Sequence, residues 1–289
     1  MSAGALLEVA VDAARMAGAL LLERVGQGAE RQIASKSTPT DLVSEADLAA
    51  EQAIRELLQA RRPHDGFIGE EGGSVEGSSG LSWVVDPLDG TINFLFGLPQ
   101  WCVSVAVRDS HGTLAGAVYD PNRDELFTAT RDGPALLTSV AGAVELRGPD
   151  QRAVAAREGL DKQAQDVQGG DPHSPGRAQL ATALVATGLA YDASVRAAQA
   201  QVLARLAPRV RDVRRFGSAA LDLAWTAAGR YDAYFERTVK QWDIAAGALV
   251  CERAGLSVLE LPVHEHLPWG ILVAPAALSE PLFELVRGP

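Results

Sequence analysis

Apolar residues recur at helical spacing in two segments near the N-terminus. The first covers about residues 5–25 and predicts an amphipathic helix. The second begins at Ser44, where Ser44 and Asp47 resemble a capping box, and it ends near Pro63. We therefore expect the chain to start with two helices.

Shorter apolar runs with the length of β-strands come next. The Gly- and Ser-rich segment 72–80 is predicted as a loop, and Trp83–Val85 after it as a strand. The following runs are separated by the turn sequences DSHG and DPNRD, which are typical of an antiparallel meander. These further strands are predicted at residues 103–107, 115–119 and 125–129.

The second half of the chain alternates helical and strand patterns. Strands are predicted at 180–186, 231–235, 257–261 and 271–274, and helices at 197–206, 218–228, 242–254 and 278–287. Before them, residues 141–178 mix Gly, Pro, Gln and Asp and allow either a hairpin or a partly mobile connection.

This order of elements predicts a layered α/β fold with mixed and antiparallel sheets, rather than a pure βαβ series. The expected organisation is an N-terminal α+β subdomain at 1–140, a variable connection at 141–178 and a C-terminal α/β subdomain at 179–289. A chain of 289 residues is long enough for these parts to form a single compact unit with a sizeable core.

Charge and composition argue against several classes of partner and location. The chain carries 37 acidic and 26 basic residues, a net charge of −11, which argues against nucleic acid or an anionic membrane as its main partner. No window has 18 uncharged apolar residues, and the apolar N-terminus carries charges unlike a secretory signal. Cys102 and Cys251 lie in apolar runs, which indicates buried free thiols and a cytoplasmic location.

An acidic motif follows the strand at Trp83–Val85. Asp86 stands at the strand end, and Pro87, which cannot donate to a ladder, is expected to stop the strand. Asp86, Asp89 and the Leu88 carbonyl would then share one tight loop, and such hard oxygen ligands suit Mg²⁺. The motif also allows a plain Asp-Gly turn with a capping acid.

The residues after Asp89 add an anion site to this motif. Gly90 makes the turn and Thr91 opens a short helical stretch, so their N–H groups point outward. Carboxylates beside a phosphate cradle are typical of metal-assisted phosphoryl chemistry. The aspartyl nucleophile of haloacid-dehalogenase-type phosphatases is a rival interpretation, but those enzymes space the two acids by two residues, and here they are three apart.

Further polar positions occur downstream. Asp243 falls in the first turn of an apolar helix, where an acid also simply complements the helix dipole. Glu236 ends the strand YDAYFE, and Gly217-Ser218 opens the helix GSAALDLAW. Each feature is weak alone, but the set in this order is specific.

The segments GEE, WVVDPLDGTINF, GSAALDLAWTAAGRYDAYFE and WDIAAGALVCERAG resemble the inositol monophosphatase family, most of all its bacterial extragenic-suppressor type. The resemblance runs from about residue 6 to 287 and is poor over 131–178. It implies the alternating α-β-α-β-α sandwich of inositol monophosphatases and fructose-1,6-bisphosphatases. It also implies hydrolysis of inositol 1-phosphate to myo-inositol and phosphate, by attack of a metal-activated water.

The resemblance implies two Mg²⁺ ions, or three in some members, with Asp86 bridging the first two. The implied ligands are Glu70, Asp86 and the Leu88 carbonyl for the first ion, and Asp86, Asp89 and Asp243 for the second. Physical chemistry agrees, because four carboxylates in one cavity raise each other's pKa unless cations are present. A metal also lowers the pKa of bound water, so no histidine base is required.

Other roles come from the resemblance alone. Glu70 and Thr91 would orient the attacking water, and Gly90 and Thr91 would hold the phosphate. The implied substrate contacts are Asp89, Gly90, Thr91, Gly217, Ser218, Ala219, Glu236 and Asp243, with a loop contact from Lys36. A homodimer and inhibition by Li⁺ are also implied.

Several alternatives stay open. Fructose 1,6-bisphosphate, histidinol phosphate and 3′-phosphoadenosine 5′-phosphate are rival substrates within the superfamily. A function of another class is also open: the chain would act mainly as a binding protein for protein or RNA in transcription. The basic run at Arg209–Arg215 is the local sequence feature that supports it.

Overall fold

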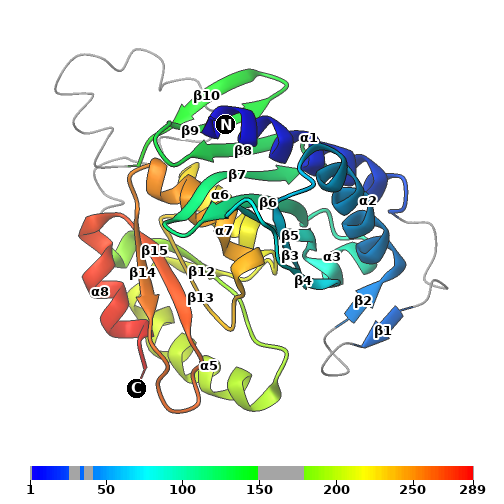
Figure 1. The fold of residues 1–289 in the computed structure, drawn as a ribbon. Helices are drawn as coiled ribbons and strands as arrows, with labels where there is room; N and C mark the ends of the chain where they lie inside the picture. The colour runs from blue at the N-terminus through cyan, green and yellow to red at the C-terminus, as the bar shows by residue number, and fades with distance from the viewer. Residues whose placement is uncertain (1, 26–32, 36–41, 149–178, 289) are drawn as a thin grey trace, which may run out of the picture. The chain divides into compact units, whose positions relative to one another are not determined.

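The computed structural model describes residues 2–25, 33–35, 42–148 and 179–288 (Figure 1). These residues divide into two compact units. The first unit comprises Met1–Glu145, Gly217–Leu221 and Lys240–Val250, and the second comprises Leu146–Phe216, Asp222–Val239 and Cys251–Pro289. Two short pieces from late in the sequence therefore belong with the N-terminal unit. Lys36 and residues 149–178 lie outside the described residues.

An eight-stranded sheet forms the frame of the first unit, with the strand order β10-β9-β8-β7-β6-β5-β3-β4 (Figure 1). β3 and β5 are parallel, and the strands from β5 to β9 pair antiparallel. The strands are β3 (Gly66–Gly69), β4 (Gly73–Val75), β5 (Ser82–Asp89), β6 (Cys102–Asp109), β7 (Gly112–Asp120), β8 (Glu125–Thr130), β9 (Ala135–Ser139) and β10 (Gly142–Leu146). The predicted antiparallel meander is confirmed. β4 is a short strand within segment 72–80, which the sequence predicts as a loop. β10 lies at the start of segment 141–178, for which the sequence allows either a hairpin or a mobile connection.

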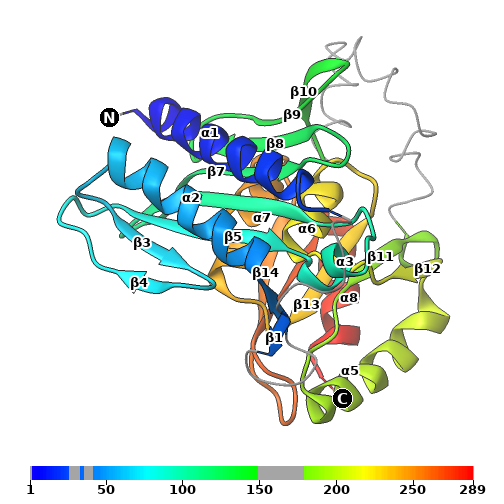
Figure 2. The ribbon, with the colours of Figure 1, turned by 90° about the vertical axis from the view of Figure 1, so that its right-hand side faces the viewer.

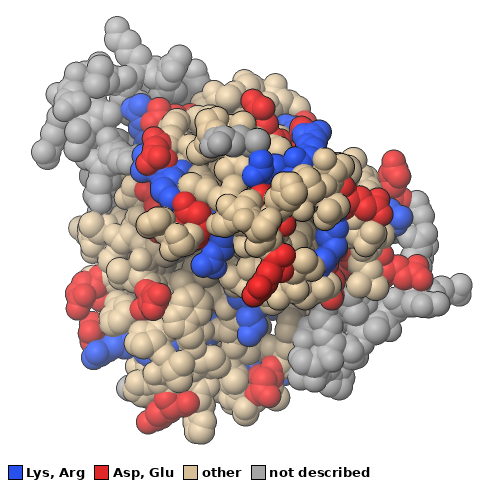
Figure 3. All heavy atoms as spheres, viewed as in Figure 1, with Lys and Arg blue, Asp and Glu red and all other residues tan. Residues whose placement is uncertain are grey.

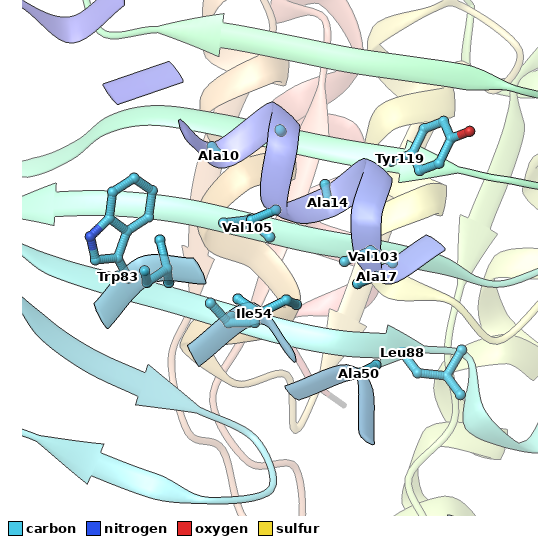
Figure 4. Packing of buried hydrophobic residues seen from close by; sticks show 14 of the residues in the cluster. Ala10, Ala14, Ala17, Ala50, Ile54, Trp83, Leu88, Val103, Val105 and Tyr119 are labelled. Carbon is cyan, nitrogen blue, oxygen red and sulfur yellow. The ribbon is translucent and has the colours of Figure 1, made fainter. Parts of the chain in front are cut away.

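Two helices, α1 (Ala3–Leu22) and α2 (Glu45–Arg61), cover one face of this sheet (Figure 2). Small residues bring α1 close: a Cβ at Gly18 would lie 2.7 Å from the Tyr119 ring. Figure 4 shows alanines of both helices packed on the sheet. The buried cluster on this face includes Ala10, Ala14, Ala17, Ala50, Ile54, Trp83, Val85, Leu88, Val103, Val105, Ala117 and Tyr119. A two-stranded sheet of β1 (Ile33–Ser35) and β2 (Leu42–Ser44) precedes α2.

Side chains alternate between the two faces of a sheet along each strand. The residues between those that face α1 and α2 therefore point to the opposite face of the sheet. There, Gly116 of β7 lies against Ala246 of α7 (Gln241–Arg253), so closely that a Cβ would meet the Ala246 Cα at 2.8 Å. The start of α6 (Ala219–Ala227) reaches the same face, since the Cys102 and Ser218 side chains are 3.5 Å apart. The polar site lies on this face.

The second unit has a five-stranded mixed sheet with the order β12-β11-β13-β15-β14. Its strands are β11 (Leu184–Thr187), β12 (Asp212–Arg214), β13 (Ala233–Arg237), β14 (Ser257–Leu261) and β15 (Gly270–Ala274). Helices α5 (Ala193–Leu206) and α8 (Ala276–Val286) contribute Val202, Leu206, Leu278 and Leu282 to its core. The predicted strand at 180–186 is instead a 3-10 turn at Leu180–Thr182 followed by β11.

Both units thus combine helices with mixed sheets, as the predicted layered α/β fold requires. Cys102 and Cys251 are buried and free, which confirms the expectation for both thiols. In the parts of the chain described above, no helix combines the length and apolar character that crossing a membrane requires.

Candidate active site

Glu70 and Asp86 meet because their strands are parallel and in register. Gly69, the last residue of β3, pairs with Val85 of β5, and the Glu70 N–H donates to the Val85 carbonyl at 3.2 Å. The next residue on each strand is therefore the acid. A hydrogen bond joins the two side chains, so these acids, 16 positions apart in sequence, are in contact.

A register shift in β5 puts Asp86 and Asp89 on the same face of the sheet. The strand does not stop at Pro87, as the sequence predicts, but continues to Asp89 with an irregularity between the two acids. Three positions apart in a regular strand, they would face opposite sides. The irregularity turns Leu88 into the hydrophobic cluster under α1 and α2 (Figure 4).

Asp89 is held by the start of α6. The Ser218 hydroxyl donates to its carboxylate at 2.7 Å, and the N–H groups of Ala219 and Ala220 donate at 3.1 and 2.6 Å. A helix N-terminus is a favourable place for a carboxylate. The GSAAL segment, whose first residues are predicted substrate contacts, therefore also fixes a predicted metal ligand.

Asp243 comes to this face through α7. The Ser104 hydroxyl on β6 donates to the Trp242 carbonyl at 3.2 Å, and Ser104 is the cross-strand partner of Asp86. The Asp243 carboxylate accepts the Lys240 N–H at 2.6 Å, which ties the side chain to the first turn of the helix. Its charge is among those that raise the pKa of Asp86.

Burial and repulsion act together on Asp86. Its side chain is 2% exposed, and burial is the main reason why its pKa lies well above the ordinary value for Asp. The charges of Glu70, Asp89 and Asp243 raise that pKa further. The pKa of Asp89 rises to about 6, mainly through burial, although the hydrogen bonds from Ser218, Ala219 and Ala220 act in the opposite direction. Asp86 therefore resists ionisation while Glu70, Asp89 and Asp243 carry their charges.

A divalent cation fits the chemistry of these donors. It would relieve the repulsion at Asp86, and the set offers only hard oxygens, the kind that Mg²⁺ takes. The Leu88 carbonyl oxygen lies 3.2 Å from the Thr91 hydroxyl, whose single hydrogen the nearer Asp47 accepts, so this carbonyl keeps a lone pair for a cation. Within residues 2–25, 33–35, 42–148 and 179–288, no three His, Cys, Asp or Glu side chains form a ready-made metal-binding group, so the structure gives no coordination geometry.

Gly90 and Thr91 form the turn after β5. Gly90 has a φ of 101°, and a Cβ there would lie 2.9 Å from the Gln100 carbonyl oxygen, so only glycine fits. Thr91 then opens α3 (Thr91–Leu95), as predicted.

Asp47 is a site residue that the sequence analysis misses. It lies on α2 with no exposed surface, and its carboxylate accepts the Thr91 hydroxyl at 2.9 Å. The sequence assigns it only a capping role. An acid on the buried side of an amphipathic helix is the signal that points to a further function.

Two of the predicted residues are not among the described residues of the first unit. Glu236, at the end of β13, belongs to the second unit, where the Tyr234 hydroxyl donates to it at 2.9 Å and its carboxylate fills the space beside Gly188. Lys36 lies outside the described residues. Gly217 adopts a φ of 86° immediately before Ser218.

Mg²⁺ should stabilise the protein more at pH 7.5 than at pH 5. Because the pKa of Asp89 is about 6 in the folded protein, against an ordinary value of 3.8, the metal-free protein loses stability as pH rises from about 4 to 6. About two pKa units correspond to about 3 kcal/mol, which a bound cation removes. Thermal unfolding with EDTA or Mg²⁺ at both pH values measures this. Asp109→Asn, on the exposed end of β6, should behave as wild type, and an equal Mg²⁺ effect at both pH values would contradict the expectation.

Comparison with known proteins identifies the family and the fold. The profile of the inositol monophosphatase family matches residues 4–277. An inositol-1-monophosphatase of Rhizobium meliloti is 40% identical over 257 residues, 88% of this chain and 85% of that protein. A Pasteurella multocida protein named Nus factor SuhB is 38% identical over 274 residues, 94% of this chain and 91% of that protein. The crystal structure of the extragenic suppressor protein suhB from Bartonella henselae has a TM-score of 0.81 at 31% identity, with 98% of each chain covered. These similarities confirm both the resemblance and the layered α/β fold.

Proposed function

The chain belongs to the inositol monophosphatase family, and on this premise we propose that it is a Mg²⁺-dependent phosphomonoester hydrolase. Its proposed reaction converts inositol 1-phosphate to myo-inositol and phosphate. The observation that carries the proposal is the gathering of Glu70, Asp86, Asp89 and Asp243 on one face of the large sheet. The charges of Glu70, Asp89 and Asp243 raise the pKa of Asp86, and divalent cations bound among the four acids would offset that repulsion.

The proposed ligands of two or three Mg²⁺ ions are Glu70, Asp86, the Leu88 carbonyl, Asp89 and Asp243. Bound Mg²⁺ supplies positive charge for the phosphate and acidity for the attacking water. The protein's part is to hold the carboxylates in place, through the β5 irregularity for Asp86 and the three donors from α6 for Asp89.

Thr91 and Asp47 provide a path for a proton. The Thr91 hydroxyl donates to buried Asp47, which leaves the lone pairs of Thr91 Oγ1 to accept a hydrogen bond from the attacking water. As that water attacks phosphorus, one of its protons would pass to Thr91 Oγ1 while the Thr91 hydroxyl proton passes to Asp47. The bond from phosphorus to the inositol oxygen breaks, and that oxygen would take up a proton from solvent. Glu70 is proposed to orient the same water.

The remaining contacts are proposed for the substrate. The N–H groups of Gly90 and Thr91 would bind the phosphate at the left-handed turn. Gly217, Ser218, Ala219 and Glu236 would face the polyol. Because Ser218 and Ala219 already donate to Asp89, their substitution should also weaken the metal site.

A substrate panel tests the proposed specificity. Purified protein with Mg²⁺ is expected to release phosphate from inositol 1-phosphate with a higher kcat/KM than from three rivals: fructose 1,6-bisphosphate, histidinol phosphate and 3′-phosphoadenosine 5′-phosphate. Millimolar Li⁺ should inhibit the release. A higher kcat/KM for one of the rivals would replace inositol phosphate as the substrate without removing the metal-dependent chemistry.

A second candidate function is binding to the transcription apparatus. It is favoured by the relative named Nus factor SuhB and by the arginines at 209–215. Arg209 and Arg215 are exposed, whereas Arg211 donates to the Thr182 carbonyl and Arg214 pairs with Asp212. On the face drawn in Figure 3, basic and acidic side chains are interspersed, which does not favour nucleic acid as the main ligand.

An affinity capture from a bacterial extract distinguishes the two functions. A stable partner that is lost in an Arg209→Glu, Arg215→Glu variant, together with negligible turnover of every phosphate tested, would rank binding above catalysis. Robust Mg²⁺-dependent turnover in both proteins supports the phosphatase.

We also propose a homodimer and a cytoplasmic location. Phe96 and Leu98, just after α3, are 74% and 53% exposed, and neighbouring exposed apolar side chains are typical of an interaction surface. The free thiols suit a reducing compartment. Light scattering should give twice the chain mass, and Phe96→Ser should lower it.

A further inference from the structure

Glu51 of α2 contacts the turn that carries Glu70. The side chain is 3% exposed, and one carboxylate oxygen, Oε2, accepts the Glu71 N–H at 2.8 Å. The other, Oε1, accepts the Arg55 Nε–H at 3.0 Å. A buried carboxylate is stable only when such partners satisfy it, so Glu51 joins the helix to the main chain beside Glu70.

Arg55 completes this contact on the far side of the turn. Its guanidinium stands over the Phe67 ring at 3.9 Å, and its Nη2 donates to the Gly73 carbonyl at 3.3 Å. Arg55 therefore neutralises Glu51 and also touches β3 and β4, the two strands that the turn connects. The charge of Glu51 is balanced within this cluster rather than at the metal site.

Two glycines make room for the Glu51 carboxylate. A Cβ at Gly69 or at Gly72 would collide with the two Glu51 oxygens. These glycines flank Glu70 and Glu71 in sequence. The two glycines of the G-E-E-G segment therefore allow its main chain to approach the Glu51 side chain closely.

The main chain of Glu70 is held on both sides by these bonds. Its own N–H donates to the Val85 carbonyl, and the N–H of the next residue donates to Glu51. The peptide groups before and after Glu70 are therefore both fixed, which sets the direction of its side chain toward Asp86. The first bond belongs to the sheet, whereas the second depends on one side chain.

We propose that Glu51 is a positioning residue for Glu70: it fixes the turn so that the Glu70 carboxylate is ready to bind the metal. The inference rests on the proposed function of Glu70. Partners that orient a metal ligand contribute about 10- to 100-fold to metal affinity. Removal of Glu51 should therefore weaken Mg²⁺ binding without touching a ligand.

The test compares Glu51→Ala with Glu51→Gln in the full chain. Glu51→Ala should lower the Mg²⁺ affinity in calorimetry by about 10- to 100-fold and speed hydrogen exchange at the Glu71 amide in the metal-free protein. Glu51→Gln keeps an acceptor of the same length, so it should restore both values most of the way. Glu56→Ala, at an exposed position on the same helix, is the control and should match wild type.

Two outcomes would overturn the proposal. One is wild-type Mg²⁺ affinity in Glu51→Ala while Glu70→Gln binds weakly; the other is unchanged exchange at the Glu71 amide. If the wild-type protein binds no Mg²⁺, the proposed function fails. Faster hydrogen exchange at the Glu71 amide in Glu51→Ala would still show that Glu51 fixes the turn. Should Glu51→Ala not fold, Glu51→Asp takes its place, because it keeps the charge but withdraws the carboxylate by one methylene.

Discussion

Asp86→Asn is expected to lower Mg²⁺-dependent phosphate release by on the order of 10³-fold or more. Asp86 is buried among the other three acids, and the amide removes the charge shared by the two proposed metal positions. The substitution keeps the side-chain volume, and in the metal-free state it removes a carboxyl whose ionisation is opposed by burial. The variant should therefore fold at least as well as wild type in EDTA.

Initial rates with saturating Mg²⁺ measure the effect, and thermal unfolding confirms that the variant is folded. The matched control is Asp109→Asn, since Asp109 is bound by Arg131 at the other end of β6 and should leave the rate unchanged. Retention of full Mg²⁺-dependent activity by Asp86→Asn would show that this carboxyl is not part of the mechanism.

Thr91→Val should lower kcat by about 10²- to 10⁴-fold, the usual contribution of a positioned proton-transfer group. Valine keeps the shape of threonine but removes the hydroxyl that donates to Asp47. The metal ligands are untouched, so the Mg²⁺ affinity should change little. This separation of kcat from metal affinity distinguishes a proton path from general damage to the site.

Asp47→Asn and the double variant test the partnership. If the two residues act as one unit, the double variant should be no worse than Thr91→Val, because the effects of coupled residues do not add. If the fold losses in kcat of the two single variants instead multiply in the double variant, Thr91 and Asp47 do not share one proton path. A Thr91→Val enzyme with unchanged kcat would remove the hydroxyl from the mechanism.

The sequence predicts much of this protein because its patterns are local. Turn sequences mark the strands of the meander, and apolar stripes mark α1 and α2. The proposed metal ligands stand in the motifs GEE, WVVDPLDGTINF and WDIAAGALVCERAG, so they could be named before the structure. Their gathering on one face could only be proposed, since it depends on strand register.

What the sequence could not predict depends on contacts between distant residues. Pro87 suggests a strand end, but β5 continues past it with a shift in register, and that shift puts Asp86 and Asp89 on the same side. Asp47 and Glu51 look like ordinary acids of a helix until α2 packs beside β3 and β5. Tertiary packing, which local propensity does not contain, decides these roles.

The most direct test of the account is a Mg²⁺ titration of EDTA-treated protein with inositol 1-phosphate as substrate. Metal-dependent hydrolysis predicts no phosphate release without metal and a saturable rise in the rate of release as Mg²⁺ is added. Phosphate release at the full rate in excess EDTA would contradict it, because the carboxylates of Glu70, Asp86, Asp89 and Asp243 would then act without the cations they are proposed to hold.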